Sequence, residues 1–423
     1  MKKWHYLAIN VTWFGTTFMW NGLHPIILPA LLLNYVPENL KNTYLGGMTF
    51  AGLLLAMFIQ PVAGGLSDRT RTRWGRRRPW MAGGTLASML LLMLMSKANG
   101  LWGIVITYVL LQGASNIAHG PAQGIIPDLV PAKKRGLASG IKNLFDMSGL
   151  VVTSLVAGSL MGRGDVVDAF MVIILVLGAS AFFTIFTLPE EPLSKKGVPA
   201  AKVSIKDLLH FDRKRYPDYA WLLLARFLIL LGIFAVQSFA QYFIRDYLHL
   251  ANAAEVTGKL MATIGLGVLV LVFPAGMLSD KIGRKRMNIL AGVMASAGIF
   301  MLLFVRDLMI LYAVGAIVGM ATGMFLSVNW ALATDLIPAD EGGKYLGLSN
   351  LATAGASAAS RLAGPLIDGV NAFAPGAFLG YPVLFVLAGL SSLAGAILMR
   401  KVHEVPVQAT GKVALAEGIS ALD

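Results

Sequence analysis

The feature that most constrains the fold is a series of long apolar runs separated by short polar loops. A hydrocarbon core about 30 Å thick is crossed by roughly 20 helical residues. Backbone groups find no water there, so such runs must form helices. The sequence therefore predicts an all-α membrane protein with twelve transmembrane helices, at residues 8–33, 43–67, 79–96, 101–128, 136–161, 168–188, 219–246, 256–279, 286–304, 308–335, 345–369 and 378–400.

The composition points the same way. Hydrophobic residues make up 56% of the chain and charged residues only 13%, and the mean hydropathy is +0.69. A soluble protein of this length needs more polar surface. The chain contains no cysteine, which excludes disulfides and thiolate metal sites. The first apolar run continues past Leu33 without a small-residue cleavage site, so we expect a retained helix rather than a signal peptide.

The net charge of +13 is concentrated in alternate loops. Basic residues are retained on the cytoplasmic side of a membrane, so this pattern predicts an inner-membrane protein with both termini in the cytoplasm. The charge is then explained by topology and by contact with anionic membrane lipids, and no soluble domain carries it as a nucleic-acid surface. The basic positions are Arg69, Arg71, Arg73, Arg76, Arg77, Arg78, Lys133, Lys134, Arg135, Lys195 through Arg215, Lys281, Arg284, Lys285 and Arg286.

The chain also contains an internal repeat. The segment Gly64–Arg69 recurs as Gly276–Lys281, and Asp128–Ala132 recurs as Asp335–Ala339. The aspartates of the first pair are 212 residues apart and those of the second pair 207. Two halves repeated in one orientation form transporters with a site between them. We therefore expect two pseudo-symmetric six-helix bundles at 1–188 and 219–401, a cytoplasmic linker at 189–218 and a cytoplasmic tail at 402–423.

These repeated segments resemble the signature loop of the major facilitator superfamily. The stretch Gln60–Pro79 is similar to the longer form of that loop in glycoside–pentoside–hexuronide cation symporters, nearest the sucrose–proton symporter branch. Gly120–Leu129 also resembles that branch, with Gln123 where its members usually have arginine. Melibiose-type members carry acids on the first two helices. This chain has none there before Asp68, which argues against a sodium site of that kind.

The resemblance implies a gate at the ends of the repeated helices. Aspartates in the signature loops would pair with the following arginines, hold the outward-facing state and release when the inner side opens. The alternative is a static surface network that adds little stability. The gating candidates are Asp68, Arg76 and Asp128 in the first half and Asp280, Arg284 and Asp335 in the second.

Polar side chains at mid-membrane depth are the candidate substrate ligands, because they are costly in lipid and usually face a cavity. All of them except Arg361 lie on the first and fourth helices of each half, which line the cavity in the proteins that this chain resembles. Amides and indoles suit a polyhydroxylated solute; the alternative for each amide is an interhelical hydrogen bond. The candidates are Trp20, Asn21, His24, Asn116, His119, Gln123, Gln237, Gln241, Asn329, Trp330 and Arg361.

Charged side chains within the predicted helices are few. Lys142 and Asp146 lie one turn apart, Arg361 lies near the middle of the eleventh helix, and Arg226 is expected to extend toward the cytoplasmic surface. Desolvation favours the neutral form of a carboxylic acid, so Asp146 could bind and release a proton. The sequence predicts Asp146 and Lys142 as the proton-coupling pair. The alternative is a permanent ion pair that offsets desolvation.

The chain contains no catalytic constellation, no phosphate-binding loop and no recognisable cofactor or metal motif. We therefore expect a secondary active transporter rather than an enzyme. Its partners would be a small polar organic solute, a sugar or glycoside, together with protons or another cation. Two alternatives remain open: a transporter of a lipid, pigment or amphipathic drug, and a non-transporting scaffold or assembly factor with the same fold.

Overall fold

The computed structural model describes residues 3–188, 215–337 and 342–403. These residues form helices joined by short loops, and no β-strand occurs among them. Ten of the helices are long and apolar enough to cross a membrane. The expected all-α membrane fold is thus confirmed. The expected linker at 189–218 falls largely outside the described residues, as does the expected tail from residue 404 onward.

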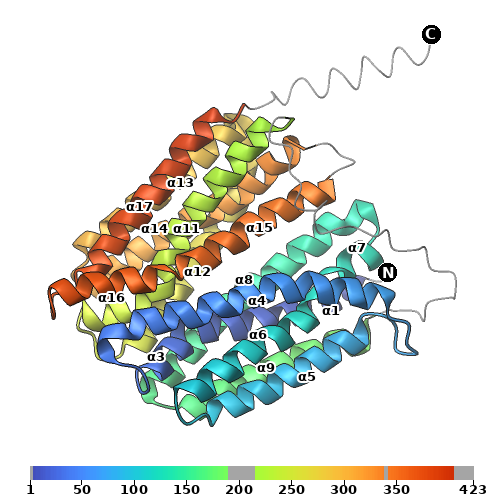
Figure 1. The fold of residues 1–423 in the computed structure, drawn as a ribbon. Coiled ribbons are helices and arrows are strands. Elements are labelled where there is room, and N and C mark those ends of the chain that lie inside the picture. The colour runs from blue at the N-terminus through green and yellow to red at the C-terminus, as the bar shows by residue number, and fades with distance from the viewer. Residues whose placement is uncertain (1–2, 189–214, 338–341, 404–423) are drawn as a thin grey trace. The chain divides into compact units, whose positions relative to one another are not determined.

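The helices follow the predicted runs closely, with ends shifted by a few residues (Figure 1). Their bounds are α1 Lys3–Ala8, α2 Val11–Gly22, a π-helical turn Leu23–Ile27, α3 Leu28–Leu32, α4 Lys41–Arg69, α5 Arg78–Ser96, α6 Leu101–Gln123, α7 Ile125–Leu129, α8 Arg135–Arg163, α9 Val166–Thr187, α11 Pro217–Asp246, α12 Ala253–Ile282, α13 Arg284–Met301, α14 Leu308–Asp335, α15 Gly342–Ser360, α16 Ala363–Phe373 and α17 Gly380–Leu398.

Two of the twelve predicted helices are broken, and these two are not among the ten long spans. The first changes from α2 through the π-helical turn into α3, where Pro25 and Pro29 lack the amide hydrogens of a regular helix. The eleventh is interrupted between α15 and α16, at Arg361 and Leu362. Such breaks free backbone carbonyls inside the membrane, and other groups must satisfy them.

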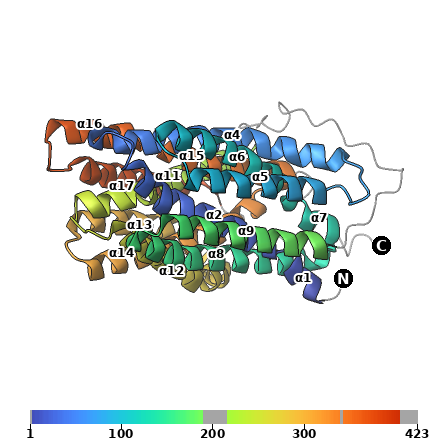
Figure 2. The ribbon, with the colours of Figure 1, turned by 90° about the horizontal axis from the view of Figure 1, so that it is seen from below.

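The chain divides into two compact units, which do not follow the two sequence halves. The first contains residues 1–202, 235–265 and 358–384, and the second contains 203–234, 266–357 and 385–423. In the first unit α4 packs on α6, α6 on α5 and α5 on α9; α2 packs on both α9 and α8. α16 lies along α4, as Figures 1 and 2 both show.

Glycines allow the closest helix contacts of the first unit. A side chain at Gly46 on α4 would meet the backbone carbonyl of Arg361, and one at Gly364 on α16 would meet the carbonyl of Asn42. A side chain at Gly258 on α12 would likewise meet the backbone of α8. Small residues at such crossings let membrane helices approach and gain van der Waals contact. These contacts hold α16 against α4, and α12 against α8.

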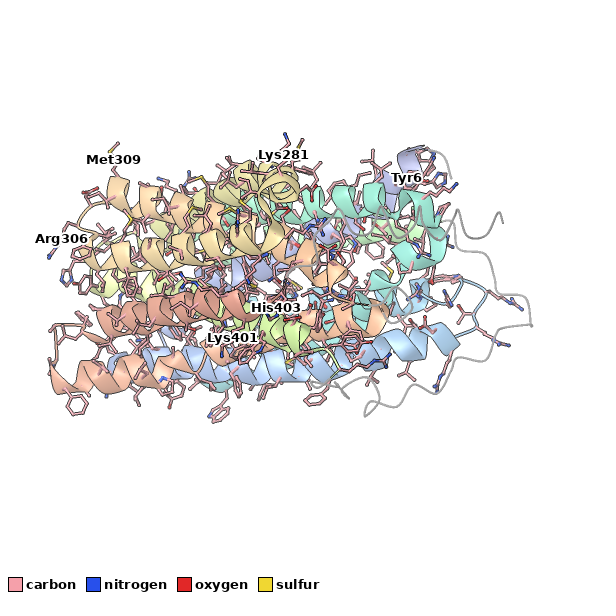
Figure 3. All side chains as sticks on the ribbon, turned by 90° about the horizontal axis from the view of Figure 1, so that it is seen from above. Tyr6, Lys281, Arg306, Met309, Lys401 and His403 are labelled. Atoms are coloured by element: carbon pink, nitrogen blue, oxygen red, sulfur yellow. The ribbon has the colours of Figure 1, made fainter. Side chains whose placement is uncertain are left out.

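In the second unit α13 packs against α14. The hydroxyl of Ser296 on α13 donates a hydrogen bond to the backbone carbonyl of Gly389 on α17, at 2.8 Å. Figure 3 shows Arg306 and Met309 at one end of this unit. Basic side chains toward its other end include Lys281, Lys401 and His403. They are therefore separated from Arg306 by the length of the helices.

Candidate functional site

A cluster of polar and aromatic side chains lies inside the first unit, next to the π-helical turn. The phenol of Tyr108 on α6 is 3.0 Å from His24 Nε2 and accepts a hydrogen bond from Gln112 Nε2 at 2.7 Å. Trp20 stacks on the His24 ring, with centroids 4.9 Å apart. The amide of Asn116 donates to the Gln112 carbonyl at 2.8 Å. We call Trp20, His24, Tyr108, Gln112 and Asn116 the His24 cluster.

Two predicted ligands have partners within the protein. Asn21 donates a hydrogen bond to Thr17 O on its own helix at 3.0 Å. Gln241, with its amide oriented to face acceptors, donates to Pro25 O at 2.9 Å and to Ile26 O at 2.8 Å. Gln241 therefore satisfies carbonyls at the π-helical turn, which is the interhelical hydrogen bond considered as the alternative. Gln237, one turn earlier on α11, is half-buried.

A second cluster surrounds Asp146 on α8. Lys142 Nζ lies 2.7 Å from one carboxylate oxygen of Asp146, and the Thr17 hydroxyl donates to the other at 2.7 Å. The Lys142 ammonium lies 4.0 Å from the ring centroid of Trp13. The carboxylate is thus held by an ammonium and a hydroxyl, and its side chain is 17% exposed.

His119 and Gln123 extend this second cluster on α6. The His119 ring contacts the ring of Trp13 edge-on, with centroids 5.0 Å apart. The Gln123 amide nitrogen lies 3.2 Å from His119 Nε2. His119 also lines a small cavity together with the hydroxyls of Thr16 and Ser115. The predicted residues of α6 therefore divide between two clusters, with Asn116 in one and His119 and Gln123 in the other.

The predicted ligands of α14 lie in the second unit, around Arg226 of α11. Arg226 donates hydrogen bonds to Asn329 Oδ1 at 2.6 Å and to Thr353 Oγ1 at 2.9 Å. Its guanidinium carbon lies 5.9 Å from the ring centroid of Trp330. Arg226 is 4% exposed. The expectation that it extends to the surface is wrong, because these polar groups bind it in the interior.

Arg361 differs from the other buried cations. It lies in the break between α15 and α16 and is 9% exposed. Its Nε is buried without a hydrogen-bond partner. Its backbone carbonyl lies against Gly46 of α4, and Gly52 of the same helix packs against Tyr108 and Gln112. The break thus brings Arg361 to the helix that also packs against the His24 cluster.

The predicted gate of the first half forms a network at the end of α4. Arg76 makes an ion pair with Asp128. The neighbouring Arg77 binds Asp128 Oδ2 at 2.5 Å, Asp68 Oδ1 at 3.0 Å and Pro121 O at 2.9 Å. Arg77 has an 8% exposed side chain, against 26% for Arg76. The centre of the network is therefore Arg77.

The second unit repeats this geometry. Arg284 Nη1 lies 2.5 Å from Asp335 Oδ2, and Arg284 Nη2 lies 3.2 Å from Asp280 Oδ1. Arg284 also donates to the backbone carbonyl of Ala331 at 2.9 Å. Arg284 follows Arg77 by 207 residues, the spacing between Asp335 and Asp128. The structural counterpart of Arg284 is therefore Arg77, the neighbour of the gating candidate Arg76.

Sequence analysis missed an ionic network at the opposite end of α4. Lys41 lies 2.7 Å from Asp246 Oδ2 of α11 and also pairs with Glu38. Tyr381 of α17 donates to Asp246 at 2.5 Å. We call Glu38, Lys41, Asp246 and Tyr381 the Lys41 cluster. Its charged groups lie at helix ends, and from the sequence alone a charged residue at a helix end is expected to face solvent.

The Lys41 cluster continues onto α16. Asp368 accepts hydrogen bonds from the Asn42 amide at 2.8 Å and from the backbone N–H of Thr43 at 2.7 Å. Lys41 is 2% exposed. Buried charges of this kind persist only when they are paired and hydrogen-bonded. The cluster therefore joins one end of α4 to α11, α16 and α17.

Tyr108, Gln112, Trp13 and Thr17 were also missed as members of the two clusters. Tyr108, Gln112 and Asn116 follow one another at intervals of four residues, so they share one face of α6. That spacing was available from the sequence. The role of Thr17 was not, because a threonine in a membrane helix ordinarily bonds its own backbone.

Comparison with known proteins gives a consistent result. The family model of the Major Facilitator Superfamily matches residues 8–360 and 222–420. The multidrug resistance protein MdtG of Klebsiella pneumoniae is 24% identical over 328 residues, covering 75% of this chain and 76% of the relative. The uncharacterized MFS-type transporter YuxJ of Bacillus subtilis is 25% identical over 313 residues, covering 72% and 75%.

Solved structures share the fold at low sequence identity. A D-xylose-proton symporter superimposes with a TM-score of 0.71 and 16% identity, covering 95% of this chain and 98% of the other. An inward-facing, unoccupied bacterial homolog of the human lysosomal transporter Spinster superimposes with a TM-score of 0.68 and 14% identity. The match covers 96% of this chain and 100% of the other.

Proposed function

Because the chain belongs to the Major Facilitator Superfamily, and is thus a multi-pass membrane transporter rather than an enzyme, we propose that it moves a small polar organic solute by alternating access. The solute we propose is a sugar or glycoside, carried together with protons. The proposal keeps the two sequence halves as its repeated bundles, with both termini in the cytoplasm of an inner-membrane protein. The resemblance to the sucrose–proton symporter branch remains part of this proposal.

The observation that carries the proposal is the His24 cluster. An imidazole, a phenol and two amides from α6 and the π-helical turn meet in the interior of the first unit. Burying such groups costs free energy unless they bond to one another or to a ligand. Trp20 adds a flat apolar face beside them. Hydrogen-bonding groups next to an aromatic ring are the chemistry that binds a sugar.

Asp146 supports proton coupling in this proposal. Its charge is balanced by Lys142 and by one hydroxyl from α2. Protonation of Asp146 would free both groups and loosen the contact between α2 and α8. Transport would then couple to the proton because the two helices repack as the carboxylate changes charge.

Two ionic networks at the two ends of α4 support alternating access. The Arg77 network lies at one end, and the Lys41 cluster lies at the other. We propose that Asp68, Arg76 and Asp128, with Asp280, Arg284 and Asp335, gate one side of the membrane. The Lys41 cluster would then gate the other side. A charged network that forms in only one state biases the equilibrium by its own free energy.

Uptake into proteoliposomes tests the function directly. The purified protein is reconstituted, and radiolabelled mono- and disaccharides, both neutral and acidic, are supplied with and without an inward proton gradient. We expect at least one sugar to enter in a protein-dependent manner and to accumulate when the gradient is present. If no sugar moves under either condition, the sugar proposal is wrong.

Transport of an amphipathic drug is the second candidate, because relatives such as the MdtG proteins are named as multidrug resistance proteins. The same vesicles distinguish it: a cationic dye would be moved against its gradient, and sugars would not compete. A scaffold or assembly factor of this fold would move neither kind of solute.

A further inference from the structure

Arg361 is a buried cation without a hydrogen-bond acceptor among the described residues. Four lysine and arginine side chains are buried among the described residues: Lys41, Arg77, Arg226 and Arg361. The first two bind carboxylates, and Arg226 binds an amide and a hydroxyl oxygen. In the described part of the chain, no hydrogen bond or ion pair joins the Arg361 guanidinium to an acceptor, and its Nε is fully enclosed.

A guanidinium in this position requires an anionic partner. It carries five N–H donors and stays charged under all ordinary conditions. Burial of such a group is strongly unfavourable unless it is paired. The C-terminal end of α15, directly before Arg361, offers a partial negative charge. That partial charge offsets only part of the cost and accepts none of the side-chain hydrogens, so the arginine is prepared for an acceptor that the described residues do not supply.

The carboxylates in the interior of the first unit are committed to other partners. Asp146 is held by Lys142, Asp246 by Lys41, and Asp368 by Asn42 and a backbone amide. The His24 cluster packs against the same helix as Arg361, through Gly52 and Gly46 of α4, and its His24 and Tyr108 bear no negative charge in their ordinary forms. Among the described residues, Arg361 is thus not paired with an anion.

The His24 cluster is oriented to bind the rest of such a ligand. Tyr108 accepts its hydrogen bond from Gln112, which directs the phenol hydrogen to His24 Nε2. His24 then carries its own hydrogen on Nδ1, and no described residue accepts a hydrogen bond from that atom. This tautomer is assigned from the hydrogen-bond network. The site therefore presents a guanidinium, one imidazole N–H and the face of Trp20.

We propose that the transported solute is a small organic anion whose carboxylate or phosphate binds Arg361. This inference rests on the proposed function and names the class of its substrate. The planar guanidinium makes two parallel hydrogen bonds to such a group. The polar body of the solute lies against His24 Nδ1 and Trp20. A neutral solute would leave the arginine donors unpaired and bind more weakly.

Matched solute pairs test the charge requirement on the purified full-length protein. The pairs are gluconate with sorbitol, glucose 6-phosphate with glucose, and galacturonate with galactose. Thermal unfolding and proteoliposome uptake are both measured. We expect an anionic member to raise Tm, by the order of 3 °C at a hundredfold excess over Kd, and to be taken up, while its neutral twin does neither. The pair that responds shows whether the recognised group is a carboxylate or a phosphate.

Two substitutions and a control complete the test. Arg361→Gln should abolish the stabilisation by the anion, and Arg361→Lys should retain part of it because the charge remains without the planar fork. Lys259→Gln removes a positive charge at an exposed position of the same unit and should leave it unchanged. Size-exclusion profiles and unliganded Tm values establish that each variant is folded. If Arg361→Gln does not fold, the comparison rests on Arg361→Lys, in which an unchanged response to the anion overturns the inference.

The outcomes separate this inference from the proposed function. If a neutral sugar binds and is transported as well as its anionic twin, the charge requirement is wrong and the transporter proposal stands. If the anion still stabilises Arg361→Gln, Arg361 is not its binding partner. If no member of any pair binds or moves, both proposals fail.

Discussion

Replacing Lys41 by methionine should open the end of α4 that, in our proposal, the Lys41 cluster gates. Lys41 is 2% exposed and pairs with Asp246, whose side chain is 3% exposed. The substitution keeps most of the apolar stem of the side chain but leaves the Asp246 carboxylate in the interior. The remaining partners of Asp246 are the Tyr381 hydroxyl at 2.5 Å and Arg245 at 3.7 Å.

The expected magnitude follows from this burial. Removing one partner of a buried ion pair costs about 3–5 kcal/mol. Because Asp246 keeps its other contacts, we expect the free-energy cost of Lys41→Met to lie at the lower end of this range, about 3 kcal/mol. That cost corresponds to roughly a hundredfold change in the ratio of closed to open protein. Asp246→Asn should cost about 1 kcal/mol, because Lys41 keeps its pair with Glu38, whose side chain is 58% exposed.

The chain contains no cysteine, so a single introduced thiol reports the opening cleanly. Thr49 is fully buried two turns along α4 from Lys41, and Thr49→Cys supplies the reporter. The rate of maleimide labelling of the purified protein should rise steeply in Lys41→Met and modestly in Asp246→Asn. The double variant should label more slowly than Lys41→Met, because no unpaired carboxylate remains. Equal rates in Lys41→Met and the parent, or a larger effect of Asp246→Asn, would refute this reasoning.

Three further predictions concern stability, each checked by thermal and denaturant unfolding of the purified variants. Gly46→Ala should cost about 1–3 kcal/mol because its methyl group meets the backbone of the facing helix. Gly47→Ala should change stability by less than about 0.5 kcal/mol, since nothing lies near that position; equal losses would contradict the packing argument. Arg77→Gln should cost about 3 kcal/mol and Arg76→Gln less than about 1 kcal/mol, because Arg77 bridges two carboxylates and is more buried than Arg76; the reverse order would remove Arg77 from the centre of the network. Gln241→Leu should cost about 1–3 kcal/mol by leaving two carbonyls of the π-helical turn without donors, and an unchanged stability would show that another group satisfies them.

The sequence predicted the helices well because each apolar run is long and the membrane leaves the backbone few options. The two broken helices show the limit of that reasoning. Hydropathy gives the length of an apolar run, whereas the π-helical turn depends on Pro25 and Pro29 together with the amide of Gln241 that caps it. The partner lies more than two hundred residues away in the sequence, and no local pattern reveals it.

The candidate site was predictable in its residue types more than in its grouping. Helical spacing placed Asn116 and His119 on one face of α6, and the structure assigns them to different clusters because Asn116 bonds Gln112 on its own helix whereas His119 contacts Trp13 of α2. The charged residues of the predicted helices were a better guide to the site than the uncharged polar residues. Lys142 and Asp146 pair as the i, i+4 spacing indicates, while the absence of an acceptor at Arg361 in the described residues becomes visible only in three dimensions.

The most direct test of the account is solute transport by an Asp146→Asn variant in proteoliposomes. The substitution keeps the shape of the side chain and removes the group that would carry the proton. We predict that the variant still exchanges labelled for unlabelled solute across the membrane, and that it no longer accumulates solute when a proton gradient is imposed. Accumulation equal to that of the parent protein would contradict the coupling role of Asp146. The failure of both proteins to exchange any solute would contradict the transport function itself.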